Sequence, residues 1–508
     1  MKKDKLFTKF NFILIIVTIS TIIRLFFLFT TPNYYNEESP AYVRDAMRML
    51  NTKHFPVWHN HPGGYQLVLS VFIFIFKNVF SAVFTSRLFS LILGVASLIY
   101  YFILCKKLFG KTVSIVSTIV LTLSMQHIIL SVNTLSYMPL YFGLICGIYY
   151  LIRYIELNKR RDYFLSIVSI SFACMMRQEA WLIIPIMFLI LLYKKQYLNS
   201  ILYALICFVY PIIYMIRSYM MFKNPVEFYY VGGGFDSFVN FVDFNMISSF
   251  TKYLIVNYPG FLFVLGIIGM LYSSYFAIKK YSHKTIIILF FAVNYVFYQI
   301  MVMSHNFIFI SSYGKEFTRY SFIFIIFLIP FTIDIIYKIL IKFTKKKQII
   351  SFGLFLIMIP YILSAYHNYS ISPYINGPPT EYYNLRDYLK ENIHDDTVLY
   401  IATKTPQTIS YAVTETNKAY RLSYFITPES FHEFIKTNYS SESLYNIQVE
   451  HLNKEIEPTT NYLIIYDNPI LSLPEINTDD LLSFYNDVHF KKININGLIV
   501  LRPKSVQK

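Results

Sequence analysis

The sequence is poor in charged residues. Asp, Glu, Lys and Arg make up 15% of its 508 residues, whereas soluble domains carry roughly 25%. In their place, 55% of the residues are hydrophobic and 19% are aromatic. Runs such as 10–29 and 320–340 approach the ~20 apolar residues that cross a hydrocarbon core. No such run follows residue 367, so the sequence predicts a helical membrane bundle over 1–367 and a water-soluble tail over 368–508.

Cysteine and nucleotide-binding motifs are also scarce. The four cysteines all fall inside predicted spans and the tail has none, which excludes disulfides from the tail, and no zinc-type spacing occurs. The glycine-rich stretch 231–235 lacks the Walker lysine and a preceding strand. We find no cytoplasmic domain for a nucleotide sugar. Covalent chemistry would therefore need an activated lipid reached from the membrane.

The net charge of +16 is concentrated in short loops between apolar runs, as the positive-inside rule describes, and this distribution argues against a nucleic-acid partner. Four lysines precede the first apolar run, so we expect a cytoplasmic N-terminus in the plasma membrane. Alternating the spans from there places the tail on the extracytoplasmic side. The basic clusters are 106–111, 159–161, 194–195, 279–284 and 345–347.

About eleven membrane spans satisfy this topology. The 16-residue stretch 65–80 is short for a crossing, and a crossing there would place the basic loop 106–111 outside. We therefore expect a juxtamembrane or re-entrant helix at 65–80. Segments 163–176 and 180–193 predict a hairpin whose tip, 176–180, faces outward. The spans are 10–30, 88–105, 112–131, 138–155, 163–176, 180–193, 198–217, 253–276, 285–303, 321–341 and 349–367.

The tail contains three strand-like runs, 397–402, 461–467 and 497–503, and a helical stretch at 381–393. Alternating strands and helices of this length predict a small α/β domain. This extracytoplasmic domain would lie on the same side as the first outer loop, 31–87.

Two adjacent acids, Glu37 and Glu38, stand where the first span leaves the membrane. A partly shielded carboxylate in this position could act as general base on an acceptor. The alternative is a pair of solvated acids that begins an amphipathic interfacial helix. Further along the same loop, His59 and His61 could hold a metal or belong to a polar turn. The sequence leaves a divalent metal open.

Three arginines lie at outer ends of spans. Arg177, at the hairpin tip, could bind phosphate oxygens through paired hydrogen bonds, or form an ion pair with Glu179, or snorkel. Arg319 could bind a second phosphate oxygen or anchor its helix at the interface. Arg87 opens the span 88–105 in the same manner.

In order and sidedness, these features resemble the GT-C superfamily of membrane glycosyltransferases, which includes the protein O-mannosyltransferases and the lipid A aminoarabinose transferases. The resemblance covers about residues 1–367. Two departures stand out: the acidic pair is Glu-Glu where the family usually begins with Asp, and the outer turn 131–139 has no acid. The matching motifs are Glu37-Glu38 with Tyr42 and Ala46, His61-Pro62-Gly63-Gly64-Tyr65, Ser86-Arg87-Leu88, Leu108-Phe109-Gly110-Lys111, Arg177-Gln178-Glu179 and Arg319-Tyr320.

The resemblance implies transfer of a hexosyl or pentosyl group, with inversion, from a polyprenyl-phosphate donor to an acceptor on the outer face. Glu38 or Glu37 would be the base, and the spacing to Tyr42 favours Glu38. Arg177, Arg319 and Arg87 would stabilise the departing phosphate. The acceptor could be a glycan, a lipid or a protein. The alternatives are a lipid or glycan flippase or transporter, or a non-catalytic member of the family.

Overall fold

A computed structural model describes residues 2–31, 38–52, 63–222, 251, 254–255, 258–279, 282–303, 318–344, 346–370 and 388, together with the strands of the tail. The chain forms two compact units. One comprises 1–32, 57–68 and 87–376, and the other comprises 33–56, 69–86 and 377–508. The predicted boundary after residue 367 stays a prediction, and each unit is described by itself.

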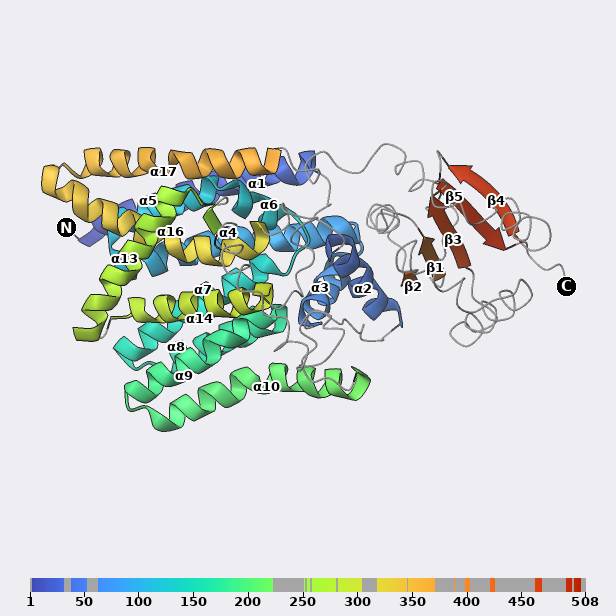
Figure 1. Ribbon diagram of the computed structural model, residues 1–508, viewed down its shortest axis with the longest axis horizontal. Coiled ribbons are helices and arrows are strands. Elements are labelled where there is room, and N and C mark those ends of the chain that lie inside the picture. The colour runs from blue at the N-terminus through green and yellow to red at the C-terminus, as the bar shows by residue number, and fades with distance from the viewer. Residues whose placement is uncertain are drawn as a thin grey trace. The chain divides into compact units, whose positions relative to one another are not determined.

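The first unit is helical, and most of its helices run side by side, whereas α13 crosses them at an angle (Figure 1). Two helices, α3 and α4, begin or end in the other unit. The elements are α1 (Lys2–Thr30), α3 (Gly64–Phe76), α4 (Ala82–Phe109), α5 (Lys111–Leu123), α6 (Met125–Val132), α7 (Tyr137–Leu157), α8 (Arg160–Met176), the 3₁₀ helix η1 (Gln178–Leu182), α9 (Ile183–Tyr193), α10 (Tyr197–Phe222), α13 (Gly260–Lys279), α14 (Lys284–Met303), α16 (Thr318–Phe343) and α17 (Lys347–Ser370).

Within the described residues, seven helices are long and apolar enough to cross a membrane, and the bent pair α5–α6 makes an eighth if it counts as one span. The other three predicted spans form shorter helices: α8 has 17 residues, α9 has 11, and the apolar part of α14 is 284–298. The chain is thus a multi-pass membrane protein, while the count of eleven stays a prediction. Helix α3 has 13 residues, about 20 Å, which is less than a bilayer core.

Helices α5 and α6 meet at an angle of 59°. The break falls at Ser124, whose backbone is extended with φ −65° and ψ 118°. The Ser124 hydroxyl shares a hydrogen bond of 2.7 Å with the hydroxyl of Tyr361 on α17. A polar contact from a neighbouring helix therefore lies at the break.

Close packing of α7 against α8 sets the position of the hairpin tip. A Cβ atom at Gly143 would lie 2.8 Å from the Ser169 carbonyl oxygen, and one at Gly147 would lie 2.4 Å from the Ile170 side chain. Small residues four apart let helix backbones approach closely in membranes. The turn between the two helices uses Asn158 in the left-handed conformation, φ 50°, a common way to end a helix.

The second unit contains α2 (Glu38–Thr52) and one five-stranded sheet of order β2-β1-β3-β5-β4. Strand β1 pairs in parallel with β2 and β3, whereas β5 pairs antiparallel with β3 and β4. All three predicted strands form. The predicted helix 381–393 lies outside the described residues except for Tyr388, so the α/β assignment stays a prediction. The strands are β1 (Val398–Ala402), β2 (Arg421–Tyr424), β3 (Tyr462–Asp467), β4 (Phe490–Ile495) and β5 (Leu498–Pro503).

Candidate functional site

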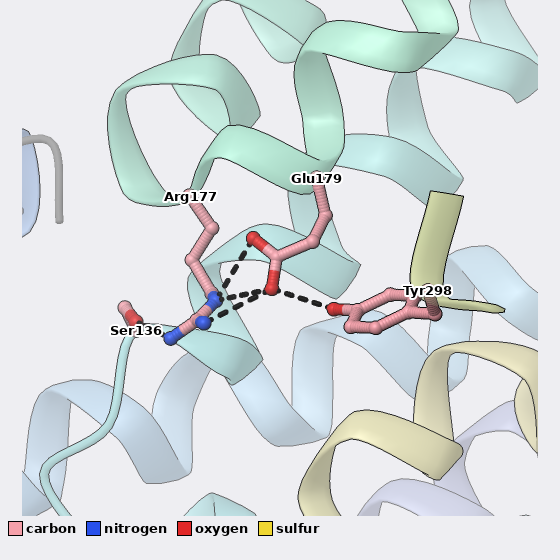
Figure 2. Close-up of polar contacts among 4 residues, drawn as sticks. All are labelled: Ser136, Arg177, Glu179 and Tyr298. Carbon is pink, nitrogen blue, oxygen red and sulfur yellow. Dashed lines mark hydrogen bonds and ion pairs between the residues drawn. The ribbon is translucent and has the colours of Figure 1, made fainter. Parts of the chain in front are cut away.

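The tip of the α8–α9 hairpin holds a buried ion pair (Figure 2). Helix α8 ends because Arg177 takes an extended conformation, φ −154° and ψ 150°, after which η1 turns the chain back. This turn brings the Arg177 Nε atom 3.0 and 3.1 Å from the two Glu179 carboxylate oxygens, and its Nη2 atom 2.9 Å from Oε1. Arg177 is 1% exposed and Glu179 6% exposed. The structure thus contains the ion pair expected as one alternative for Arg177, while binding of a phosphate by Arg177 stays a prediction.

Tyr298 of α14 donates a 2.7 Å hydrogen bond to Glu179 Oε1. Glu179 lies between the two predicted spans of the hairpin. Burial by itself raises the pKa of its carboxyl, but the Arg177 guanidinium and the hydrogen bonds from the backbone, Tyr298 and Arg177 outweigh burial and lower the pKa below its ordinary value. Glu179 is therefore held ionised, and its charge balances that of Arg177.

The start of α7 forms the other side of this cluster. Arg177 Nη1 donates to the Ser136 hydroxyl at 3.3 Å, and the guanidinium lies over the Tyr137 ring, 4.1 Å from its centroid. Such a cation–π contact is worth about 2 kcal/mol when desolvated. Ser136 and Tyr137 can reach the tip because α7 and α8 pack so closely. The ion pair, Ser136, Tyr137 and Tyr298 thus form one buried polar cluster, which we call the hairpin cluster.

Arg87 is held by a different set of partners. Its Nε atom donates to the Val132 carbonyl oxygen at 2.7 Å, and its Nη2 atom donates to the Thr31 hydroxyl at 3.3 Å. Val132 ends α6, where the last carbonyls of a helix lack partners within it. Arg87 therefore connects the ends of α1 and α6 at the start of α4, and it is 8% exposed.

Gln66, in the first turn of α3, is fully buried, and within the described part of the chain neither of its amide atoms has a hydrogen-bond partner. A buried amide without a partner costs roughly 1–3 kcal/mol. Helix α3 begins against the hairpin, since a Cβ atom at Gly64 would lie 2.5 Å from the Met175 carbonyl oxygen. A polar ligand at this end of the bundle could satisfy Gln66. Gln66 was not among the site residues predicted from the sequence.

A third buried arginine, Arg24, was not among the residues predicted from the sequence. Arg24 of α1 is 0% exposed and donates to His127 Nδ1 at 2.6 Å, to the Ser20 hydroxyl at 2.7 Å and to the Ser131 hydroxyl at 3.3 Å. His127 Nε2 lies 3.1 Å from the hydroxyl of Ser97 on α4. Glycine at position 94 makes room for the Ser131 side chain, because a Cβ atom there would lie 2.3 Å from the Ser131 hydroxyl. We call these residues the Arg24 network.

The predicted acidic pair is described only in part. Glu37 lies outside the described residues, and Glu38 is the first residue of α2, with its side chain outside the described part. Tyr42, one turn later on α2, is fully buried. Next to it in the same helix, Arg44 Nε donates to the Asp45 carboxylate at 2.8 Å. The roles of Glu37, Glu38 and Tyr42 remain predictions.

The remaining predicted site residues are not described. His59 and His61 lie outside the described residues, and Arg319 opens α16 with its side chain outside the described part. Among the side chains that the structure does describe, no group of three or more His, Cys, Asp or Glu could hold a metal ion. A metal at the predicted histidines therefore stays an open question.

Comparison with known proteins agrees with this architecture. The family model of dolichyl-phosphate-mannose-protein mannosyltransferases matches residues 60–216. This stretch contains Arg87, Ser136 and the Arg177–Glu179 pair. A search of curated protein sequences finds no significant match.

Solved structures match over nearly the whole chain. ArnT from Cupriavidus metallidurans bound to undecaprenyl phosphate aligns with a TM-score of 0.61 and 9% identity, over 98% of this chain and 98% of that chain. The oligosaccharyltransferase of Archaeoglobus fulgidus, tethered with an acceptor peptide, aligns with a TM-score of 0.56 and 12% identity, over 98% of this chain and 74% of that chain.

Together these matches confirm the predicted resemblance. The chain has the fold of the GT-C membrane glycosyltransferases. More particularly, residues 60–216 are similar to the protein mannosyltransferase family, and nearly the whole chain is similar in fold to ArnT.

Proposed function

We propose that the protein transfers a hexosyl or pentosyl group from a polyprenyl-phosphate donor to an acceptor on the outer face of the membrane, with inversion. The observation that carries the proposal is the fold likeness over almost the full length of both chains to a protein crystallised with undecaprenyl phosphate. The family match to mannosyltransferases supports it from the sequence side.

The acid of the first outer loop, Glu38 or Glu37, would take the proton from the acceptor hydroxyl or amine as that atom attacks the anomeric carbon. The bond between the anomeric carbon and the phosphate oxygen breaks in the same step, and the lipid phosphate leaves with the electron pair. Tyr42, one turn after Glu38 on α2, would orient this loop, and His59 and His61 follow in the same segment.

Arg87, Arg177 and Arg319 would stabilise the departing phosphate, where negative charge grows in the transition state. The ion pair with Glu179 supports a specific role for Arg177. Its charge is balanced by Glu179, so it would contribute directed N–H groups and little net charge. Glu179 and Tyr298 would orient the guanidinium, and the unpartnered Gln66 amide would bind a polar group of the donor.

The proposed topology has about eleven spans, with the N-terminus cytoplasmic and the tail, 368–508, forming an extracytoplasmic α/β domain. The acceptor would be a glycan, a lipid or a protein. The donor's lipid tail would lie between helices of the bundle, which explains why no nucleotide site is needed.

Release of sugar from radiolabelled polyprenyl-phosphate sugars tests the proposal. Detergent-purified wild type is compared with Glu37→Ala/Glu38→Ala, with crude membranes as acceptor. We expect the wild type to remove label from the lipid and the double variant to lose at least about a hundredfold, the usual contribution of a general base. Full activity in the double variant would contradict the assigned base.

A lipid flippase is the second candidate, and the break between α5 and α6 favours it, since broken helices mark binding sites in transporters. A flippase would move a labelled polyprenyl-phosphate sugar across vesicle membranes and leave its glycosidic bond intact. An inert wild type that moves intact lipid would therefore replace the proposed function with this one.

A further inference from the structure

The Arg24 network places a guanidinium inside the helical unit with only neutral partners. Its contacts are the hydroxyls of Ser20 and Ser131, the Ser20 carbonyl oxygen and the His127 ring. Arginine stays protonated in proteins and can only donate. Among the described residues, no carboxylate lies within ion-pair distance of Arg24.

The sequence of the surrounding helices explains this absence. Helix α1 packs against α5 and α6, and α4 joins the network through Ser97. Helices α4, α5 and α6 contain no Asp or Glu, and the single acid of α1, Asp4, lies 20 residues before Arg24. In α16, which brings Phe322 against His127, the acid Asp334 binds Lys284 and Lys338.

His127 does not add a second charge. Because Arg24 donates to Nδ1, that nitrogen must be an unprotonated acceptor. Its Nε2–H then donates to the Ser97 hydroxyl, which itself donates to the Gly94 carbonyl oxygen at 2.7 Å. The imidazole is therefore neutral, and the network carries one uncompensated positive charge. Ionisable groups in membrane spans are rare and usually functional.

We propose that Arg24 is a positioning residue that holds an anionic lipid phosphate at the outer end of α1 through its buried charge, without contact. This inference rests on the proposed function and its topology. Arg24 precedes the end of α1, Thr30, by six residues, or about 9 Å. At an effective dielectric constant of about 20, a charge ~10 Å away strengthens binding of a monoanion roughly tenfold. Salt screens a buried charge little.

Two lipids that differ only in the presence of the phosphate group test the proposal. Binding of polyprenyl phosphate and of polyprenol to purified protein is measured for the wild type, Arg24→Gln and Arg24→Lys. We expect Arg24→Gln to weaken binding of polyprenyl phosphate about tenfold and to leave polyprenol binding unchanged, and Arg24→Lys to bind both lipids as the wild type does. Arg160→Gln makes the same change at an exposed position at the start of α8 and should change neither.

Equal weakening for both lipids would show a purely structural network and overturn the proposal, as would unchanged binding. Competition by inorganic phosphate, weakened in Arg24→Gln, would assign the site to free phosphate instead of the lipid. If Arg24→Gln does not fold, Arg24→Met/His127→Leu removes the charge and its partner together and serves in the same assay. A wild type that binds neither lipid would overturn the proposed function as well. If the wild type binds polyprenyl phosphate and Arg24→Gln binds it equally well, this inference alone is overturned.

Discussion

Among the described residues of the helical unit, two arginines, Arg24 and Arg177, are at most 1% exposed, and they are held in opposite ways. Arg177 meets a carboxylate with two of its nitrogens and lies on an aromatic ring. Arg24 meets two hydroxyls, a carbonyl oxygen and a neutral imidazole. The first arrangement cancels the charge of the arginine, while the second leaves it in place.

The two arrangements would act on a ligand in different ways, one through the direction of hydrogen bonds and the other through net charge. A balanced pair such as Arg177–Glu179 fixes the direction of hydrogen bonds and produces little field beyond its own neighbours. An unbalanced guanidinium in a low-dielectric surrounding acts over a longer distance. The hairpin cluster is therefore suited to orient a ligand, and the Arg24 network is suited to attract an anion.

The largest expected effect comes from breaking the balanced pair. Arg177→Met leaves the Glu179 carboxylate buried without its cation, and removal of one partner from a buried pair costs about 3–5 kcal/mol of folding stability. We expect a clear drop in the thermal unfolding midpoint of the detergent-purified protein. Glu179→Leu should cause a loss of similar size, because it leaves the guanidinium unbalanced.

The double variant Arg177→Met/Glu179→Leu is the matched control for this pair. Replacing both charges by apolar side chains is often neutral for stability, so the unfolding midpoint should return toward the wild type. Glycosyl transfer should stay low, since the directed N–H groups are gone. Recovery of activity together with stability would limit the hairpin cluster to a structural role.

A smaller effect is expected from acid. The pKa of Glu179 is lowered from its ordinary value of 4.5, so its ionisation stabilises the folded protein above about pH 4.5, and this contribution is lost as the pH falls through the folded-state pKa. Unfolding midpoints measured from pH 6 to pH 3 should fall more steeply for the wild type than for Glu179→Gln. Tyr298→Phe removes one hydrogen bond that lowers the Glu179 pKa, so its acid-induced loss should be smaller and should be complete at a higher pH than in the wild type. Identical curves for all three proteins would show that ionisation of Glu179 does not stabilise the fold.

Of these two buried arginines, only the Arg177–Glu179 pair could be predicted from the sequence. The pair Arg177 and Glu179 stands two residues apart at a break between apolar runs, and an ion pair between them was one of the expected alternatives. The α7–α8 approach that adds Ser136 and Tyr137 depends on Gly143 and Gly147, whose packing partners a single sequence does not specify.

The Arg24 network gave a weaker signal. An arginine inside the run 10–29 and a histidine inside 112–131 are unusual in spans, but they lie 103 residues apart, and no periodicity connects them. In the tail, β1, β3 and β5 were expected from apolar runs. The strands β2 and β4 were missed because RLSY is short and FKKINI is half polar.

The smallest change in stability is expected when the Arg24 charge and its imidazole partner are removed together. In Arg24→Met/His127→Leu, the loss of several hydrogen bonds, each worth about 1 kcal/mol net, is offset by removal of an unbalanced buried charge and by burial of apolar side chains. We expect the unfolding midpoint to stay within the equivalent of about 1 kcal/mol of the wild type. A loss as large as that of Arg177→Met would mean that neutral partners hold this arginine as firmly as a carboxylate holds the other. An unchanged midpoint, combined with weaker binding of polyprenyl phosphate, would show that the chain keeps the buried charge for the ligand and not for the fold.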